Sequence, residues 1–276
     1  MQIKKWTIRL IATTLLIAGL LLIITLNPVL TYANKTNYNN YSIYYSKTLD
    51  PQFTLKLEQA TLLLQESEFY VSGLKLDICL NDGSAYPTIV KKMLGPAFAW
   101  GFYNKVVLQG AFNCAENYAE LNGYKWNLVQ LLAHEMTHCL QYKKFGFWKS
   151  KPIANIPDWK WEGYAEYIAR QDYNQKNLFQ NIERLNNADT SKWEIIFEDG
   201  TIAPIDYYKD WILVQYCLDI KKLSYEQLIK DKTEESELRA AMMKWYSENK
   251  ANAQQVALQN WGSTVVIQPI ISVHLQ

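Results

Sequence analysis

Residues 133–139 read AHEMTHC, an H-E-x-x-H pattern inside an apolar stretch. Apolar residues recur at helical spacing around the pattern: Leu128, Leu131, Leu132 and Met136. This periodicity predicts a helix with one buried face. On that helix His134 and His138 lie one turn apart on the same face, so both imidazoles can bind one metal ion. Glu135 is placed to act on a water at that ion, as the general base of a hydrolytic site must.

A chance occurrence of the pattern on a surface helix is the alternative. The chain has only three histidines, and two of them fall in this pattern with a glutamate between them. The third, His274, lies far away in the sequence and is expected to be a surface group. We therefore favour the metal site.

A catalytic metal site that keeps one position for water takes three protein ligands, and the third is often a carboxylate. Residues 157–167 read PDWKWEGYAEY and offer Glu162 and Glu166, one helical turn apart. This stretch resembles the second active-site helix of the gluzincin zinc metallopeptidases, in the peptidase MA-like superfamily. The resemblance implies that Glu162 is the third ligand of a Zn²⁺ ion and that Glu166 orients a ligating histidine. The alternative is an ordinary amphipathic helix with two solvated acids.

The spacing between the two motifs departs from the family. His138 and Glu162 are 24 positions apart (162 − 138 = 24), somewhat more than in the thermolysin-like and aminopeptidase-like branches. The extra residues fall in 143–158, where Gly146 and two prolines predict a loop. A longer loop between the two helices is compatible with the site but leaves the subfamily open.

The resemblance also implies a fold. We expect an α+β, zincin-like domain over residues 34–276. It would have a small N-terminal mixed sheet in an α/β lobe (34–120), a mostly helical lobe with the metal site (121–250) and a C-terminal tail (251–276). An edge strand would lie over the active-site helix and pair with an extended substrate. Residues 106–111, on a strand predicted at 105–109, are the candidate edge, and a purely structural strand is the alternative.

Residues 109–113 read QGAFN, where aminopeptidases of this family carry G-x-M-E-N, so exopeptidase action has no support. Residues 204–211 read PIDYYKDW and lead into an apolar helix expected at 212–218. In aminopeptidase-like relatives a tyrosine in the corresponding segment stabilises the oxyanion. The resemblance implies this role for Tyr207, or for Tyr208 if the register slips by one; ordinary packing of both is the alternative.

The first 33 residues predict export. Lys4, Lys5 and Arg9 precede an uncharged run of 17 residues, 10–26, which is either a signal-anchor helix or a signal peptide cleaved near 31–33. The basic residues place the N-terminus in the cytoplasm. The catalytic domain is then extracytoplasmic, held at the membrane or secreted after cleavage, and the length of the run favours a retained anchor.

Other elements follow from local patterns. We expect a polar linker at 34–40, strands at 41–45 and 74–80, a helix at 50–67, a capping box at 224–227 and a strand or packed tail at 265–271. Four cysteines in an exported chain permit two disulfides, with three possible connectivities: Cys79, Cys114, Cys139 and Cys217. A formal net charge of +1 gives no support for binding to nucleic acid.

Together these features predict a zinc-dependent endopeptidase-like hydrolase, exported and membrane-anchored, with a peptide or protein substrate. Two alternatives stay open. One is a membrane-tethered zinc-binding or protein-interaction module of the same fold without peptidase activity. The other is a hydrolase that uses the same zinc chemistry on a non-peptide bond.

Overall fold

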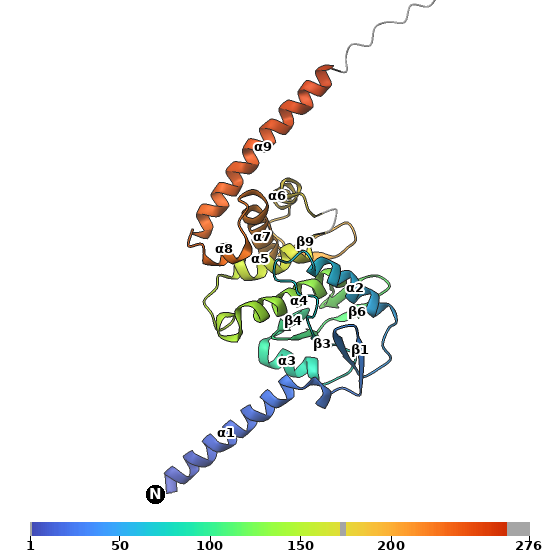
Figure 1. The fold of residues 1–276 in the computed structure, drawn as a ribbon, viewed down its shortest axis with the longest axis vertical. Helices are drawn as coiled ribbons and strands as arrows, with labels where there is room; N and C mark the ends of the chain where they lie inside the picture. The colour runs from blue at the N-terminus through green and yellow to red at the C-terminus, as the bar shows by residue number, and fades with distance from the viewer. Residues whose placement is uncertain (1, 172–174, 264–276) are drawn as a thin grey trace, which may run out of the picture. The chain divides into compact units, whose positions relative to one another are not determined.

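The computed structural model describes residues 2–171 and 175–263 and divides into two compact units, Met1–Lys230 and Asp231–Gln276. The fold is mixed α+β with one N-terminal apolar helix, as expected (Figure 1). In the second unit, helix α9 (Glu235–Ser263) continues past residue 251. The predicted C-terminal strand and His274 lie outside the described residues.

A five-stranded mixed sheet forms the core of the first unit. Its order is β1 (Asn34–Tyr38), β2 (Tyr41–Tyr45), β3 (Leu76–Cys79), β5 (Lys105–Leu108) and β4 (Ala99–Phe102). The pairs β2–β3 and β3–β5 are parallel, whereas β1–β2 and β4–β5 are antiparallel. The expected small mixed sheet is confirmed.

The predicted linker at 34–40 is wrong, because this segment forms strand β1. Tyr38 pairs with Tyr41, so only Asn39 and Asn40 make the turn. Asn39 has a φ of 52°, a left-handed conformation that asparagine tolerates and that two-residue hairpins favour. The polar side chains of β1 lie on an outer strand, where they remain in water.

The predicted edge strand is also wrong. The strand at 105–109 is β5, which is paired on both sides, and the edge of the sheet on this side is β4 (Ala99–Phe102). The two are joined by a tight turn in which Tyr103 has a φ of 54°. Tyrosine is not a usual residue for this conformation, so the turn carries no clear sequence signal.

Helices and a second sheet complete the α/β part. Helix α2 (Gln52–Leu64) follows Asp50, whose Oδ1 accepts a hydrogen bond from the Gln52 amide, and ends three residues before the expected end. Helix α4 (Leu128–Phe145) packs on α2, β4 and β5. The remaining elements here are α3 (Tyr86–Leu94) and an antiparallel sheet of β6 (Ala111–Asn113), β7 (Tyr118–Leu121) and β8 (Tyr124–Asn127).

The helical part begins after the short helix η2 (Phe147–Lys149). Helix α5 (Asp158–Ala169) packs between α4 and α7 (Ile205–Gln215). Helix α7 begins earlier than expected, directly after Pro204, and passes into a π-helical segment, η3 (Tyr216–Ile220). The other elements are α6 (Leu178–Asn186), β9 (Glu194–Ile196), β10 (Ile202–Pro204) and α8 (Tyr225–Lys230).

The predicted capping box before α8 is confirmed. The Gln227 amide donates to Ser224 Oγ at 3.1 Å, and the Ser224 amide donates to Gln227 Oε1 at 2.8 Å. This reciprocal pair satisfies two amides at the start of the helix.

The permitted disulfides are not formed. All four cysteines lie within the described residues; none of them forms a disulfide, and each is buried. Burial, together with the nearby Asp50, raises the pKa of the Cys114 thiol to about 12. The cysteines therefore act as small apolar side chains in this fold.

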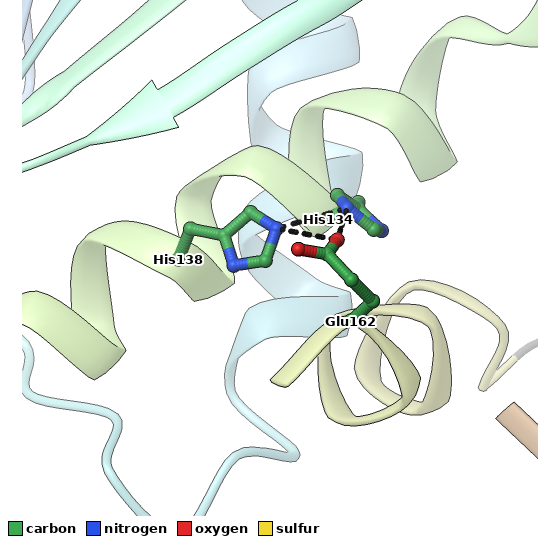
Figure 2. Close-up of side chains that lie close together, drawn as sticks. All are labelled: His134, His138 and Glu162. Carbon is green, nitrogen blue, oxygen red and sulfur yellow. Dashed lines mark hydrogen bonds and ion pairs between the residues drawn. The ribbon is translucent and has the colours of Figure 1, made fainter. Parts of the chain in front are cut away.

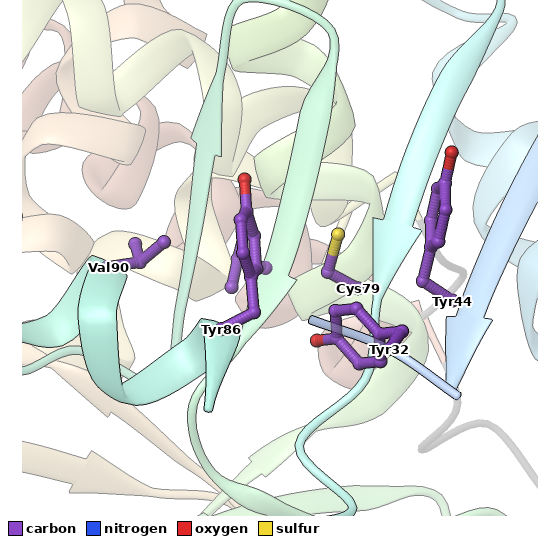
Figure 3. Packing of buried hydrophobic residues seen from close by; sticks show 6 residues of the cluster. Tyr32, Tyr44, Cys79, Tyr86 and Val90 are labelled. Carbon is purple, nitrogen blue, oxygen red and sulfur yellow. The ribbon is translucent and has the colours of Figure 1, made fainter. Parts of the chain in front are cut away.

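Helix α1 (Gln2–Leu26) contains a stretch, Lys4–Leu26, that is long and apolar enough to cross a membrane or to serve as a signal sequence. It is followed by the short helix η1 (Pro28–Leu30). Tyr32 then enters a buried cluster with Tyr44, Cys79 and Tyr86 (Figure 3). The chain after α1 is thus packed into the first unit.

Candidate metal centre

Helix α4 carries the H-E-x-x-H pattern through the core. The side chain of Asn127 caps its start by accepting a hydrogen bond from the Gln130 amide, and the helix ends before Gly146, which has a φ of 79°. Both motif histidines are buried: His134 is 3% exposed and His138 is 6% exposed. Burial on nearly every face fixes the direction in which the two imidazoles point.

Helix α5 brings the third group to the same place. Glu162 Oε2 lies 3.2 Å from His138 Nε2 and 3.4 Å from His134 Nε2, and the two Nε2 atoms are 3.0 Å apart (Figure 2). Ligands about 2.05 Å from a tetrahedral metal ion are separated by about 3.3–3.4 Å. The observed triangle is within a few tenths of an ångström of that spacing, so the three residues could hold a metal ion.

The protons of the histidines support the same conclusion. His138 Nδ1 lies 2.7 Å from Gln141 Oε1, an acceptor, so this nitrogen carries the ring proton. His134 Nδ1 lies 2.9 Å from a carboxylate oxygen of Glu166, although the ring N–H is not aimed squarely at it. Each Nε2 faces Glu162. Burial opposes a positive charge on His134, but the hydrogen bonds to Glu162 and Glu166 outweigh burial and raise its pKa to about 10. The site thus favours a positive charge, which a metal ion held by the three residues could supply.

Glu166 is where the resemblance implied. It is 1% exposed, contacts His134 and forms an ion pair with Arg170 one turn further along α5. Burial opposes its ionisation, but Arg170 and His134 outweigh burial and lower the pKa of the carboxyl to about 2. Glu166 is therefore a buried anion in contact with His134.

Two further residues contact His138 or Glu166 and were not predicted from the sequence. Gln141 holds His138 and donates its own N–H groups to the Trp161 carbonyl at 3.0 Å and to the Tyr225 hydroxyl at 2.8 Å. Arg170 is 1% exposed and neutralises Glu166. Helical spacing could have indicated both, since Gln141 is three residues after His138 and Arg170 is four after Glu166.

The electrostatics of the centre follow from its burial. The pKa of Glu135 is raised, because the cost of burying its charge exceeds the stabilisation by His134 and His138. A hydrogen bond from the Gly101 amide on β4 partly offsets this shift. For Glu162 the balance is reversed: burial opposes the charged form, but the two imidazoles hold its pKa well below the usual range.

The structure distinguishes the two candidate tyrosines, Tyr207 and Tyr208. The ring of Tyr207 lies 5.9 Å from that of His134, and the nearby charge of Glu162, followed by burial, raises the pKa of its phenol well above normal. Tyr208 is buried in the core, where its hydroxyl donates to the Asn181 carbonyl at 3.1 Å and accepts from Arg184. Tyr207 is thus the one at the centre, as a neutral hydrogen-bond donor.

The centre opens into a cleft of about 640 Å³. Glu135 and Tyr207 line it together with the three candidate ligands, and the edge strand β4 and the following Tyr103 form one wall. No residue of the predicted substrate-binding edge at 106–111 lines this cleft. The strand that lines it is β4. The arrangement combines a candidate metal centre, a buried carboxylate, a neutral phenol and an open strand edge.

Known proteins give no independent indication of family. No model of a known protein family matches this chain, and no curated protein has a matching sequence. The function proposed for the chain therefore depends on the residues and their geometry.

Proposed function

We propose that the chain is a zinc-dependent endopeptidase-like hydrolase with His134, His138 and Glu162 as metal ligands and Glu135 as general base. The observation that supports this most directly is the convergence of three potential ligand atoms, 3.0–3.4 Å apart, in a cleft that is also lined by a buried carboxylate, Glu135. Two histidine nitrogens and one carboxylate oxygen in tetrahedral spacing suit zinc, with one position left for water. When bound, zinc would polarise the scissile carbonyl and acidify the attacking water.

Glu135 would move the protons. It follows a candidate ligand on α4, faces the cleft and is only 6% exposed. Its raised pKa makes it a better proton acceptor than a solvated carboxylate, so it would take a proton from the attacking water and deliver it to the leaving amine. General acid–base help of this kind contributes about 10²–10⁴-fold to a rate.

Tyr207 would act on the developing oxyanion. Its phenol stays protonated because the carboxylates around it disfavour a further negative charge. A neutral O–H in the wall of the cleft can donate a hydrogen bond to the oxygen that becomes charged in the transition state. The phenol already lies in the wall of the cleft before the substrate binds, so the hydrogen-bond donor is preorganised.

Strand β4 supports a peptide as the substrate. Among the described strands it pairs only with β5, so its other side offers backbone donors and acceptors along the cleft. An extended peptide can add to such an edge through main-chain hydrogen bonds with little regard for its side chains. This mode of binding favours cleavage within a chain.

The decisive experiment substitutes Glu135→Gln in the full chain in detergent. We expect one zinc per chain, as in the wild type, and hydrolysis of a quenched fluorescent peptide library reduced by about 10²–10⁴-fold. Glu194→Gln is the matched control, because Glu194 is similarly buried, at 8% exposed, and does not line the cleft. Loss of zinc with the fold intact would make Glu135 structural, and unchanged hydrolysis would remove its role as base.

A second substitution tests the ligand set. Glu162→Ala should weaken zinc binding, measured by competition with a chromogenic chelator, because one of three ligands is removed. Unchanged affinity would reassign the third ligand, with Glu166 the next candidate. If the zinc-loaded wild-type chain hydrolyses no peptide, the non-catalytic module is the better description.

A further inference from the structure

The chain just after α1 is part of the core of the first unit. Tyr32 is 8% exposed, and its hydroxyl donates to the Leu80 carbonyl at 2.8 Å. Its ring lies 5.9 Å from the rings of both Tyr44 and Tyr86 (Figure 3). Cleavage near 31–33 would therefore cut a packed segment and separate Tyr32 from its cluster. The packing favours a helix that stays attached.

The last turns of α1 are also bonded to the domain. The Tyr86 hydroxyl donates to the Thr25 carbonyl at 2.5 Å, and Ser84 Oγ donates to the Thr31 carbonyl at 3.1 Å. Ile24 packs against the cluster of Tyr32. The C-terminal end of the apolar helix thus has a defined place beside α3 (Figure 1).

The cleft of the metal centre reaches this same place. Thr25 lines the cleft, as do Val90 and Met93 of α3, and His134 and Glu162 line the same cleft. Thr25 lies one residue before the end of the apolar stretch Lys4–Leu26. If that stretch spans a membrane, the outer part of the cleft lies at the boundary of the lipid.

The rim of the cleft is suited to that boundary. Four of its lining side chains are large, apolar and between 41% and 52% exposed: Met93, Leu94, Phe147 and Ile153. Beside them are the 77% exposed ring of Trp148 and the exposed Lys91, Lys92 and Lys149. An exposed apolar patch is typical of a surface that binds a protein or a membrane. Tryptophan and lysine around apolar residues are typical of a surface that rests on lipid headgroups.

We propose that α1 is retained, that this rim rests on the lipid surface, and that the cleft takes an apolar polypeptide segment directly where it leaves the membrane. The continuity of the cleft with the end of the apolar helix identifies this occupant, because such a segment can pass along β4 without leaving the interface. Cleavage of the segment rests on the proposed hydrolase function, but the lipid contact and the capture of the segment do not.

Lipid contact is tested with the full chain in vesicles of phosphatidylethanolamine and phosphatidylglycerol. An environment-sensitive fluorophore is attached at Leu94→Cys or, as a control, at Leu55→Cys. Leu55 is similarly exposed, at 50%, but lies on α2, which covers the β1–β2 side of the sheet. The native cysteines are buried, so they compete poorly for the label. We expect a blue shift and quenching by brominated lipid at position 94 only; equal behaviour at both positions would overturn the proposal.

Capture is tested with a photoreactive phenylalanine analogue replacing Phe147 in the Glu135→Gln chain, so that the result does not depend on turnover. Two model peptides share a leucine-rich membrane helix and one apolar segment, placed either next to the helix or after a polar linker of about 30 residues. Both peptides are concentrated on the same membrane, so they differ only in the distance between the apolar segment and the membrane helix. We expect about tenfold more cross-linking of the proximal segment. Equal yields would overturn the proposal, whereas a wild-type chain that captures but never cleaves would refute only the hydrolase function.

Discussion

Replacing Gly163 with alanine tests whether the close approach of helices α5 and α7 positions Glu162 at the candidate metal centre. A Cβ at this position would lie 2.5 Å from the Asp210 carbonyl oxygen and 2.8 Å from Val214 Cγ2. Ordinary contact begins near 3.4 Å, so the two helices would have to separate by about 0.9 Å (3.4 − 2.5). Overpacking of this kind costs about 1–3 kcal/mol of folding stability.

The same displacement acts on the adjacent residue, Glu162. Metal–ligand distances tolerate deviations of about 0.2 Å, which is much less than the helix shift. We therefore expect Gly163→Ala to weaken zinc binding by about 10–100-fold, comparable to the loss of an outer partner of a ligand. Denaturant unfolding of the metal-free chain in detergent measures the stability, and chelator competition measures the affinity.

Gly73→Ala is the matched control for this substitution. A Cβ at Gly73 meets no atom within 4 Å, and its backbone is not in the left-handed region. It should leave both the stability and the zinc affinity close to those of the wild type. If Gly163→Ala behaves like Gly73→Ala in both measurements, the close contact of α5 with α7 does not position Glu162, and the reasoning is refuted.

Three further substitutions probe separate parts of the structure. Tyr207→Phe should lower kcat by about 10²–10³-fold in steady-state assays and change KM little, because it removes a donor used only in the transition state; an equal loss for Tyr208→Phe would contradict the assignment. Gln141→Met should reduce zinc affinity by about 10–100-fold, since His138 loses its orienting acceptor; unchanged affinity in chelator competition would remove that role. Tyr32→Ala should destabilise the chain by about 3–5 kcal/mol in denaturant unfolding, as expected for a buried aromatic ring, and a neutral effect would argue against its place in the core.

The candidate ligands could be found from the sequence because helical geometry is local. A spacing of four residues brings His134 and His138 to one face of α4, and the same spacing relates Glu162 to Glu166 on α5. The distance between the two helices depends on long-range packing, so the sequence could only suggest by resemblance that they meet. The structure brings them together at hydrogen-bonding distance.

The errors of the sequence analysis concern strand pairing. The strand predicted at residues 105–109 is present as β5, but nothing local shows whether a strand has one neighbour or two. Strand β4 reads AWGF and lacks a clear alternating pattern, and its turn to β5 uses Tyr103 in a left-handed conformation. The edge of the sheet was therefore assigned to β5, one strand away from its actual position.

Two glycines now explain why that edge matters for the centre. A Cβ at Gly101 would lie 2.2 Å from the carbonyl oxygen of Glu135, so β4 directly touches the helix that carries the proposed base. At Gly163 the equivalent contact holds α5 against α7. One close approach sets the distance from the strand edge to Glu135, and the other sets the position of Glu162. A peptide on β4 would therefore lie next to both the proposed base and the candidate metal ligands.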